Sequence, residues 1–113
     1  MEQKRKREIV VAMNYKVKLS LIVRDVDKTC FCAGAKELSL PFVPFVGLRL
    51  HEDMQVYTLA TVGWADNEQC FYCSVEMSEE LLSDGDLIDM DFIIETAKNS
   101  GWVGFNKIHR AEV

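Results

Sequence analysis

Hydrophobic and polar residues alternate most clearly between Val56 and Met77, in two arms that flank a short polar segment. A period of two places successive side chains on opposite faces of a β-strand. The polar segment contains Asp66 and Asn67, whose side chains favour turns because they hydrogen-bond to the nearby backbone. The pattern therefore predicts an antiparallel hairpin of strands 56–64 and 70–77, around which the rest of the chain is organised.

The segment from Tyr15 to Arg24 is a second clear strand. Its apolar residues share one face, while the opposite face carries Lys16, Lys18, Ser20 and Arg24, with Ile22 as the exception. This pattern is typical of a half-buried strand with its basic side in water. The same alternation predicts further strands at 45–52, 87–97 and 102–108, with residues 98–101 as the loop between the last two.

Three segments alternate less cleanly. Residues 29–39 contain several helix-forming side chains but also Gly34, so a helical turn and a loop both remain open. Residues 40–46 contain Pro41 and Pro44, which predicts an extended apolar connection. Residues 78–83 predict one short helical turn, which the turn Asp84–Asp86 follows.

These elements predict a mainly β fold that borders on α+β. We expect six to seven strands in a single small, strongly curved antiparallel sheet or barrel, with one or two short helical turns, because closure removes exposed edges. An open α+β sheet with a longer helix near residue 35 is the alternative. We expect residues 1–8 to form a disordered basic tail and residues 9–113 to form one globular β-rich domain.

The composition is that of an ordinary globular protein, with 49% hydrophobic and 27% charged residues. No apolar run approaches the roughly 18 residues of a membrane-spanning helix. The run Ile9–Met13 is too short for the core of a signal peptide. These features predict a soluble, cytoplasmic protein with no membrane partner, whose four cysteines are reduced.

The net charge of −5 conceals an asymmetry along the chain. The basic run Lys4–Arg7 could be a nuclear address, an electrostatic tether or simply a solvated terminus. From Glu8 onward, 9 lysines and arginines stand against 17 acidic residues. Between Leu50 and Ala97 there are 12 carboxylates and no lysine or arginine. Such an acidic body argues against binding to nucleic acid, which requires cations that replace phosphate counterions.

A first candidate binding site consists of carboxylates that the predicted strands and turns place on outward faces. It comprises Glu76, Asp84, Asp86, Asp89, Asp91 and Glu95. Such a surface would capture a basic partner, as an inhibitor, immunity protein or nucleic-acid decoy does, with a salt-sensitive association rate. Alternatively, the carboxylates only keep the protein soluble, and Lys16, Lys18 and Arg24 fold back over them.

Two groups of residues could in principle hold a metal ion. Cys30, Cys32, Cys70 and Cys73 offer four thiols for zinc, but the last two would point to opposite faces of one strand. The acidic run from Asp84 departs from a calcium-binding loop at its fifth and sixth positions. We therefore expect no metal and no cofactor.

The sequence offers no clear catalytic group. His51 and His109 are the only histidines, and both are expected at the surface. No glycines flank a serine in the manner of a nucleophile elbow, and no glycine-rich phosphate loop is present. We therefore assign no catalytic residue.

A second candidate binding site is aromatic. It comprises Phe42, Phe45, Trp64, Trp102 and Phe105, which could line a pocket or an interface or belong to the core. We expect a non-catalytic binding or interaction module that acts on a protein partner, on a small-molecule ligand or on itself as a dimer. The alternatives are an acidic protein that captures a basic partner and a small enzyme with an unrecognised site.

Overall fold

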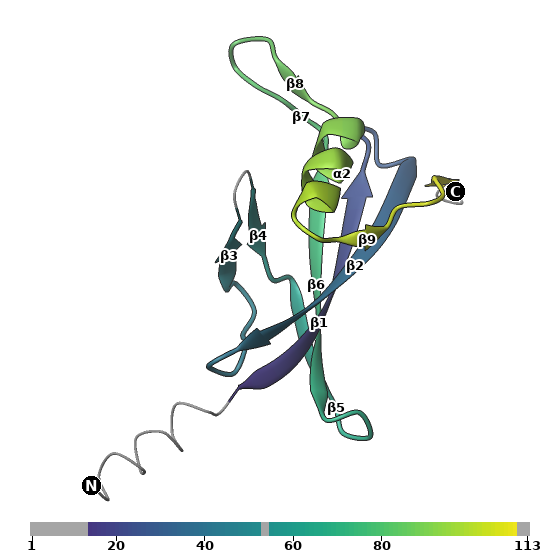
Figure 1. The fold of residues 1–113 in the computed structure, drawn as a ribbon. Coiled ribbons are helices and arrows are strands. Elements are labelled where there is room, and N and C mark those ends of the chain that lie inside the picture. Colours follow the sequence, from purple (N-terminus) through teal and green to yellow (C-terminus); the bar gives the residue numbers. More distant parts are fainter. Residues whose placement is uncertain (1–13, 53–54, 111–113) are drawn as a thin grey trace, which may run out of the picture.

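The computed structural model describes residues 14–52 and 55–110, so the predicted basic tail and the run Lys4–Arg7 lie outside the described residues. The strands of the main sheet are β1 (Tyr15–Arg24), β2 (Cys30–Leu40), β5 (Thr61–Ala65), β6 (Cys70–Ser78), β9 (Val103–Gly104) and β10 (His109–Arg110). Within the described ranges, two short hairpins and one helix complete the fold: β3 (Arg49–His51) with β4 (Val56–Thr58), β7 (Glu80–Leu81) with β8 (Leu87–Ile88), and α2 (Met90–Asn99) (Figure 1).

The main sheet has the order β10-β2-β1-β6-β5, and β9 also pairs with β2. Strand β1 lies antiparallel to β2 and parallel to β6, whereas β5 and β6 form an antiparallel hairpin. The mainly β prediction is confirmed. The sheet is nevertheless mixed and open rather than wholly antiparallel or closed into a barrel. A parallel neighbour requires a crossover connection, and here the chain passes through β2 to β5 before β6 joins β1.

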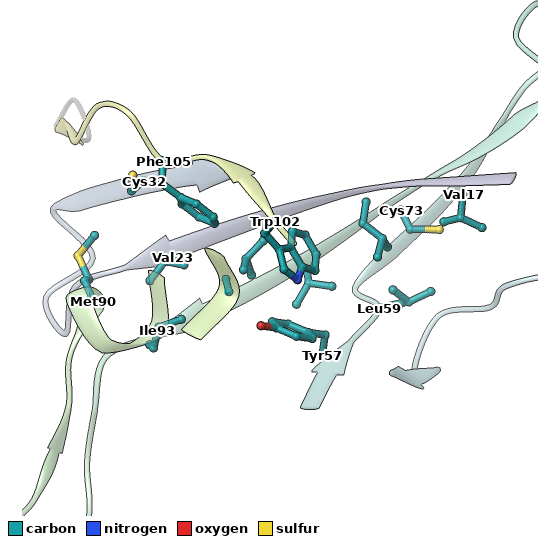
Figure 2. Close-up of a cluster of buried hydrophobic side chains, with 14 of the residues drawn as sticks. Val17, Val23, Cys32, Tyr57, Leu59, Cys73, Met90, Ile93, Trp102 and Phe105 are labelled. Atoms are coloured by element: carbon teal, nitrogen blue, oxygen red, sulfur yellow. The ribbon is translucent and has the colours of Figure 1, made fainter. Parts of the chain in front are cut away.

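The core covers only one face of this sheet. Strand β1 contributes four fully buried side chains to this inner face: Val17, Leu19, Leu21 and Val23. Against them pack Ile93 of α2 together with Tyr57, Leu59 and Trp102 (Figure 2). The opposite, outer face carries the polar residues of β1, as the alternation of that strand predicts.

The predicted strands at 15–24 and 70–77 are confirmed as β1 and β6, and the turn between β5 and β6 spans residues 66–69. The predicted strand 56–64 is divided into β4 and β5. Leu59 and Ala60 separate the two strands, because β4 pairs with β3 whereas β5 pairs with β6. Of the predicted strand 45–52, only Arg49–His51 is extended and paired.

Residues 29–39 are neither helix nor loop, because residues 30–40 form β2. The segment pairs with β1 from Tyr15 opposite Leu40 to Arg24 opposite Phe31, and Gly34 makes room there for a side chain from far along the chain. The ring of Phe105 lies where a Cβ atom at Gly34 would stand, and Gly104 approaches the same residue from β9. The helix-forming residues Ala33 and Ala35 fill exposed positions on the outer face. Tertiary packing thus overrides local propensity here.

The predicted strand 87–97 is wrong, since β8 ends at Ile88 and α2 begins at Met90. Asp89 caps the helix, because its Oδ1 accepts a hydrogen bond of 2.8 Å from the Phe92 amide. The buried residues Met90, Ile93 and Ala97 follow a helical spacing of three and four. The predicted loop 98–101 is consequently the end of this helix.

The remaining differences are smaller. Residues 78–83 contain the end of β6 and the strand β7 instead of a helical turn, and the predicted turn 84–86 joins β7 to β8. The predicted strand 102–108 is replaced by the two-residue strands β9 and β10. Phe105 separates them with a φ of 60°, a left-handed conformation that interrupts strand pairing.

Candidate interaction surfaces

The five aromatic candidates separate into two groups. Trp102 and Phe105 are core residues, with 2% and 8% of their surface exposed. Trp102 packs against Tyr57 with a centroid distance of 5.1 Å. Both are buried in the described fold, so neither is accessible to a partner there.

The other three candidates remain accessible. Phe42 and Phe45 are 44% and 55% exposed in the connection from β2 to β3, and Trp64 is 50% exposed on β5. The neighbouring Val43 and Val46 are also exposed. We call these five residues the apolar end, because the connection and β5 both lie in the lower part of the molecule in Figure 1. Large contiguous apolar patches on the surface of a folded protein commonly mark interaction sites.

Trp64 is held in place from one side. Its ring packs edge-on against Phe71 of β6, with 4.8 Å between the ring centroids. The Phe71 ring in turn packs edge-on against Tyr15 of β1, with 6.1 Å between the centroids. The indole Nε1 donates a hydrogen bond of 3.3 Å to the Oδ1 of Asp66 in the following turn. These contacts fix the ring on the inner face of β5, with half of its surface in solvent.

The six acidic candidates do not form one surface. Glu76 lies on the outer face of β6, Asp84 and Asp86 occupy the turn of the β7–β8 hairpin, and the other three belong to α2 or its cap. The predicted outward strand face was wrong because residues 90–95 are helical. The carboxylate of Asp84 is engaged locally, since it accepts a hydrogen bond of 3.0 Å from the Asp86 amide.

Asp91 and Glu95 lie one turn apart on α2 and are both exposed. With Ile94, Lys98 and Asn99 they line an open surface hollow of about 380 Å³. This part of the acidic set is available to a partner.

The basic residues of β1 are neutralised on the outer face. Three ion pairs are present: Lys16 with Glu37 at 3.6 Å, Lys18 with Glu68 at 2.9 Å, and Arg24 with Glu76 at 3.0 Å. Glu76 is therefore already engaged by a cation of its own chain. The predicted possibility that β1 cations neutralise carboxylates is realised for Glu76, although not for the residues of α2.

The pair Lys18–Glu68 belongs to a small network with Tyr72, whose hydroxyl donates to Glu68 at 2.8 Å. The hydrogen bonds from Lys18 and then from Tyr72 lower the pKa of Glu68. The same carboxylate raises the pKa of both Lys18 and Tyr72. Beside this network lies an open hollow of about 320 Å³ over Ser20 and Ala35. Sequence reasoning missed this hollow, because locating it requires the register of β1, β2 and β6.

A second polar cluster lies on the inner face of the sheet. Sequence reasoning missed this cluster as well. Lys36 points to the inner face, where its amine pairs with Glu52 and donates to the carbonyl of Ser100 at 2.7 Å. The indole Nε1 of Trp102 donates to Glu52 at 3.0 Å. The cluster joins β2, the β3–β4 hairpin and the loop after α2, so it fixes the elements that cover the core.

Tyr57 lies beside this cluster and is 1% exposed. Its hydroxyl has no hydrogen-bond partner among residues 14–52 and 55–110. Burial, and then the nearby charge of Glu52, raise the pKa of Tyr57 to about 12.

The cysteines and histidines are not gathered into a site. Cys30 is half-buried and the other three cysteines are buried, and burial raises the pKa of the Cys73 thiol. His51 is exposed on β3, whereas His109 stacks on Phe31 at 5.0 Å. Within the described ranges, no three His, Cys, Asp or Glu side chains are grouped so that they could hold a metal ion.

Comparisons with known proteins add no assignment: no family model, no curated protein and no solved structure matches this chain. Within residues 14–52 and 55–110, no helix has the length and apolarity needed to span a membrane.

Proposed function

We propose that this protein is a non-catalytic interaction module that binds a protein partner. The observation that carries the proposal is the apolar end, where Phe42, Phe45 and Trp64 are each about half exposed. Aromatic side chains provide much of the binding energy at protein interfaces, because they bury a large area and lose little conformational entropy. The partner surface would be apolar at its centre.

A protein partner fits the charge distribution better than a nucleic acid. The cations on the outer face, Lys16, Lys18 and Arg24, are each paired with a carboxylate of the chain. A phosphate backbone would have to displace those carboxylates. The proposal includes a cytoplasmic location, since all four thiols are free and a reducing compartment keeps them so.

A capture experiment tests the proposal. The tagged protein is incubated with lysate of the source cell, and the captured proteins are compared with those bound by the double variant Phe42→Ser/Phe45→Ser. The matched control is Val103→Ser/Ile108→Ser, which removes two apolar side chains of similar or greater exposure on other elements. We expect one protein to be retained by the wild type and the control and lost by the Phe42/Phe45 variant. Equal capture by all three proteins would refute the proposal.

A second candidate function is the capture of a basic partner by the β7–β8 hairpin and α2. Exposed carboxylates there accompany the exposed apolar residues Leu81, Leu87 and Phe92, and the first cation after them is Lys98. Leu81 lies directly opposite Leu87 in the hairpin. This combination suits an amphipathic basic segment, whose association would weaken as salt screens the charges.

The structure sharpens the test of this second candidate. Asp89 must be kept because it caps α2, and Glu79 must be kept because it accepts hydrogen bonds from the amides of Val26 and Met90. The informative variant therefore combines D84N, D86N, D91N and E95Q. A synthetic amphipathic peptide of lysine and leucine serves as the probe. Binding at low salt that this variant loses supports the candidate, whereas equal binding by both proteins removes it.

A further inference from the structure

The two edges of the main sheet differ. On one side, β9 and β10 pair with residues 34–35 and 30–31 of β2. On the other side, β5 pairs with β6, and no other described strand lies beside it. In such an edge strand, alternate residues leave a backbone N–H and C=O without a strand partner. Strand β5 therefore presents an unused row of hydrogen-bonding groups.

Strand β5 lacks two of the usual features that prevent pairing with another chain, namely charged side chains and proline. Its sequence, Thr61-Val62-Gly63-Trp64-Ala65, contains no charge and no proline. Natural edge strands are commonly protected by lysine, proline or a bulge. The residues on its inner face are instead apolar, since Val62 is half-buried and Trp64 is half exposed.

We infer that β5 pairs antiparallel with β5 of a second copy of this chain, about a two-fold axis at Gly63. The axis places Trp64 of each copy opposite Val62 of the other on the inner face, and Thr61 opposite Ala65 on the outer face. An aromatic residue facing a β-branched residue is a favoured cross-strand pair. The exposed half of the Trp64 ring is covered, and the two sheets become one.

A second copy fits this edge because β5 is complementary to itself. Small residues meet small residues on the outer face, and the two bulky residues meet each other on the inner face. The nearest carboxylate of the strand end, Asp66, falls opposite Ala60 of the second copy, so the pairing brings no like charges together. A two-fold dimer uses the same patch on both subunits, as this register requires.

The inference deepens the proposed function by naming one protein partner, a second copy of this chain. It rests on that function only because Trp64 belongs to the apolar end.

A cysteine at position 63 tests the register directly. A Cβ atom at Gly63 meets nothing closer than the Tyr72 carbonyl oxygen at 3.8 Å, so the substitution fits the fold. Two residues facing each other across an antiparallel pair have Cα atoms about 4.5–5.5 Å apart, which is within the range of a disulfide.

The experiment uses the full chain carrying Cys30→Ser, which removes the one native thiol that is not buried. In this background, Gly63→Cys is compared with Val103→Cys, a position on the outer face at the far edge of the sheet. Under mild oxidation we expect Gly63→Cys to form a disulfide-linked dimer and Val103→Cys to remain mainly monomeric. Equal cross-linking of the two variants overturns the inference.

Sedimentation velocity of the unmodified chain gives a second, independent measurement. We expect a monomer–dimer equilibrium that Trp64→Lys weakens by about tenfold or more, while Val103→Lys leaves it unchanged. Thermal unfolding confirms that both variants are folded. A wild type that stays monomeric, or a dimer that is insensitive to Trp64→Lys, overturns the inference. Neither result bears on partner capture through Phe42 and Phe45, so the two proposals fail separately.

Discussion

Replacing Tyr57 with phenylalanine should stabilise this protein at neutral pH. The ring of Tyr57 packs against Trp102 and is almost fully buried, whereas its hydroxyl has no hydrogen-bond partner among the described residues. A buried polar group without a partner costs about 1–3 kcal/mol. Because phenylalanine keeps the ring and removes that group, we expect the free energy of unfolding to rise by about 1 kcal/mol.

The same substitution should change how stability depends on alkaline pH. The pKa of Tyr57 is raised from 10.0 to about 12, so the fold favours the protonated phenol. Below pH 10 this shift leaves the free energy of unfolding unchanged. Above pH 10 the phenol ionises more readily in the unfolded chain, so the free energy of unfolding falls until the pH has passed the folded pKa. A shift of this size corresponds to about 3 kcal/mol. The wild type should lose stability of this order between pH 10 and about 12, and Tyr57→Phe should lose correspondingly less.

Urea unfolding at neutral pH and at several alkaline values measures both effects. Tyr72→Phe is the control, since Tyr72 is an exposed tyrosine whose hydroxyl is hydrogen-bonded to Glu68. The reasoning is refuted if Tyr57→Phe is less stable than the wild type at neutral pH, which would show that the hydroxyl has a partner. It is also refuted if the two proteins lose stability in parallel above pH 10.

Three further predictions concern other parts of the fold. Gly34→Ala should lower the free energy of unfolding by about 1–3 kcal/mol in urea, because the new methyl group collides with the Phe105 ring, whereas Gly63→Ala should be tolerated. Asp89→Ala should cost about 1 kcal/mol and reduce the helical circular dichroism signal, since the cap of α2 is lost. Titration of native thiols should find one fast-reacting cysteine, Cys30, with the other three reacting only after unfolding.

The sequence predicted best those strands whose two faces differ in polarity. The buried residues of β1 alternate with Lys16, Lys18, Ser20 and Arg24, with Ile22 as the exception, so a strand buries one set and exposes the other. The same holds for β6. The parallel pairing of β6 with β1 could not be predicted from the sequence. Local alternation does not indicate which strand is the neighbour or whether the two strands run parallel or antiparallel.

Two errors have a physical cause in long-range packing. In residues 87–97 the apolar positions fit a strand through Ile88, Met90 and Phe92, and they fit a helix through Met90, Ile93 and Ala97. Packing of the helical set against the sheet decided between them, together with the cap at Asp89. That cap residue was the available indication, since aspartate before a helically spaced apolar set is a common helix start.

In residues 29–39 the decisive contact is with Phe105, far along the chain. When only its neighbours in sequence are considered, a glycine within a run of helix formers weakens a helix. Here it makes room for an aromatic ring on a strand. No local rule distinguishes these two roles of Gly34, because the ring arrives from the other end of the sequence.

The candidate residues show the same limit. Phe42 and Trp102 are both aromatic residues in apolar surroundings in the sequence, yet one is 44% exposed and the other 2%. Burial depends on which elements cover the sheet. Likewise Glu76 was a plausible free carboxylate until the parallel register of β6 with β1 brought it to Arg24.

An open sheet with one covered face leaves few places where this molecule can gain stability by association. The outer face of β1 already satisfies its cations with carboxylates, so covering it would cost the desolvation of several ion pairs. At the edge opposite β5, β9 and β10 pair with residues 34–35 and 30–31 of β2 and so cover part of that strand. The edge at β5 combines unused backbone groups with the half-exposed ring of Trp64, and the connection from β2 to β3, which carries Phe42 and Phe45, lies in the same lower part of Figure 1. Association there removes apolar surface from water without breaking an ion pair, which is why both proposals converge on that end of the fold.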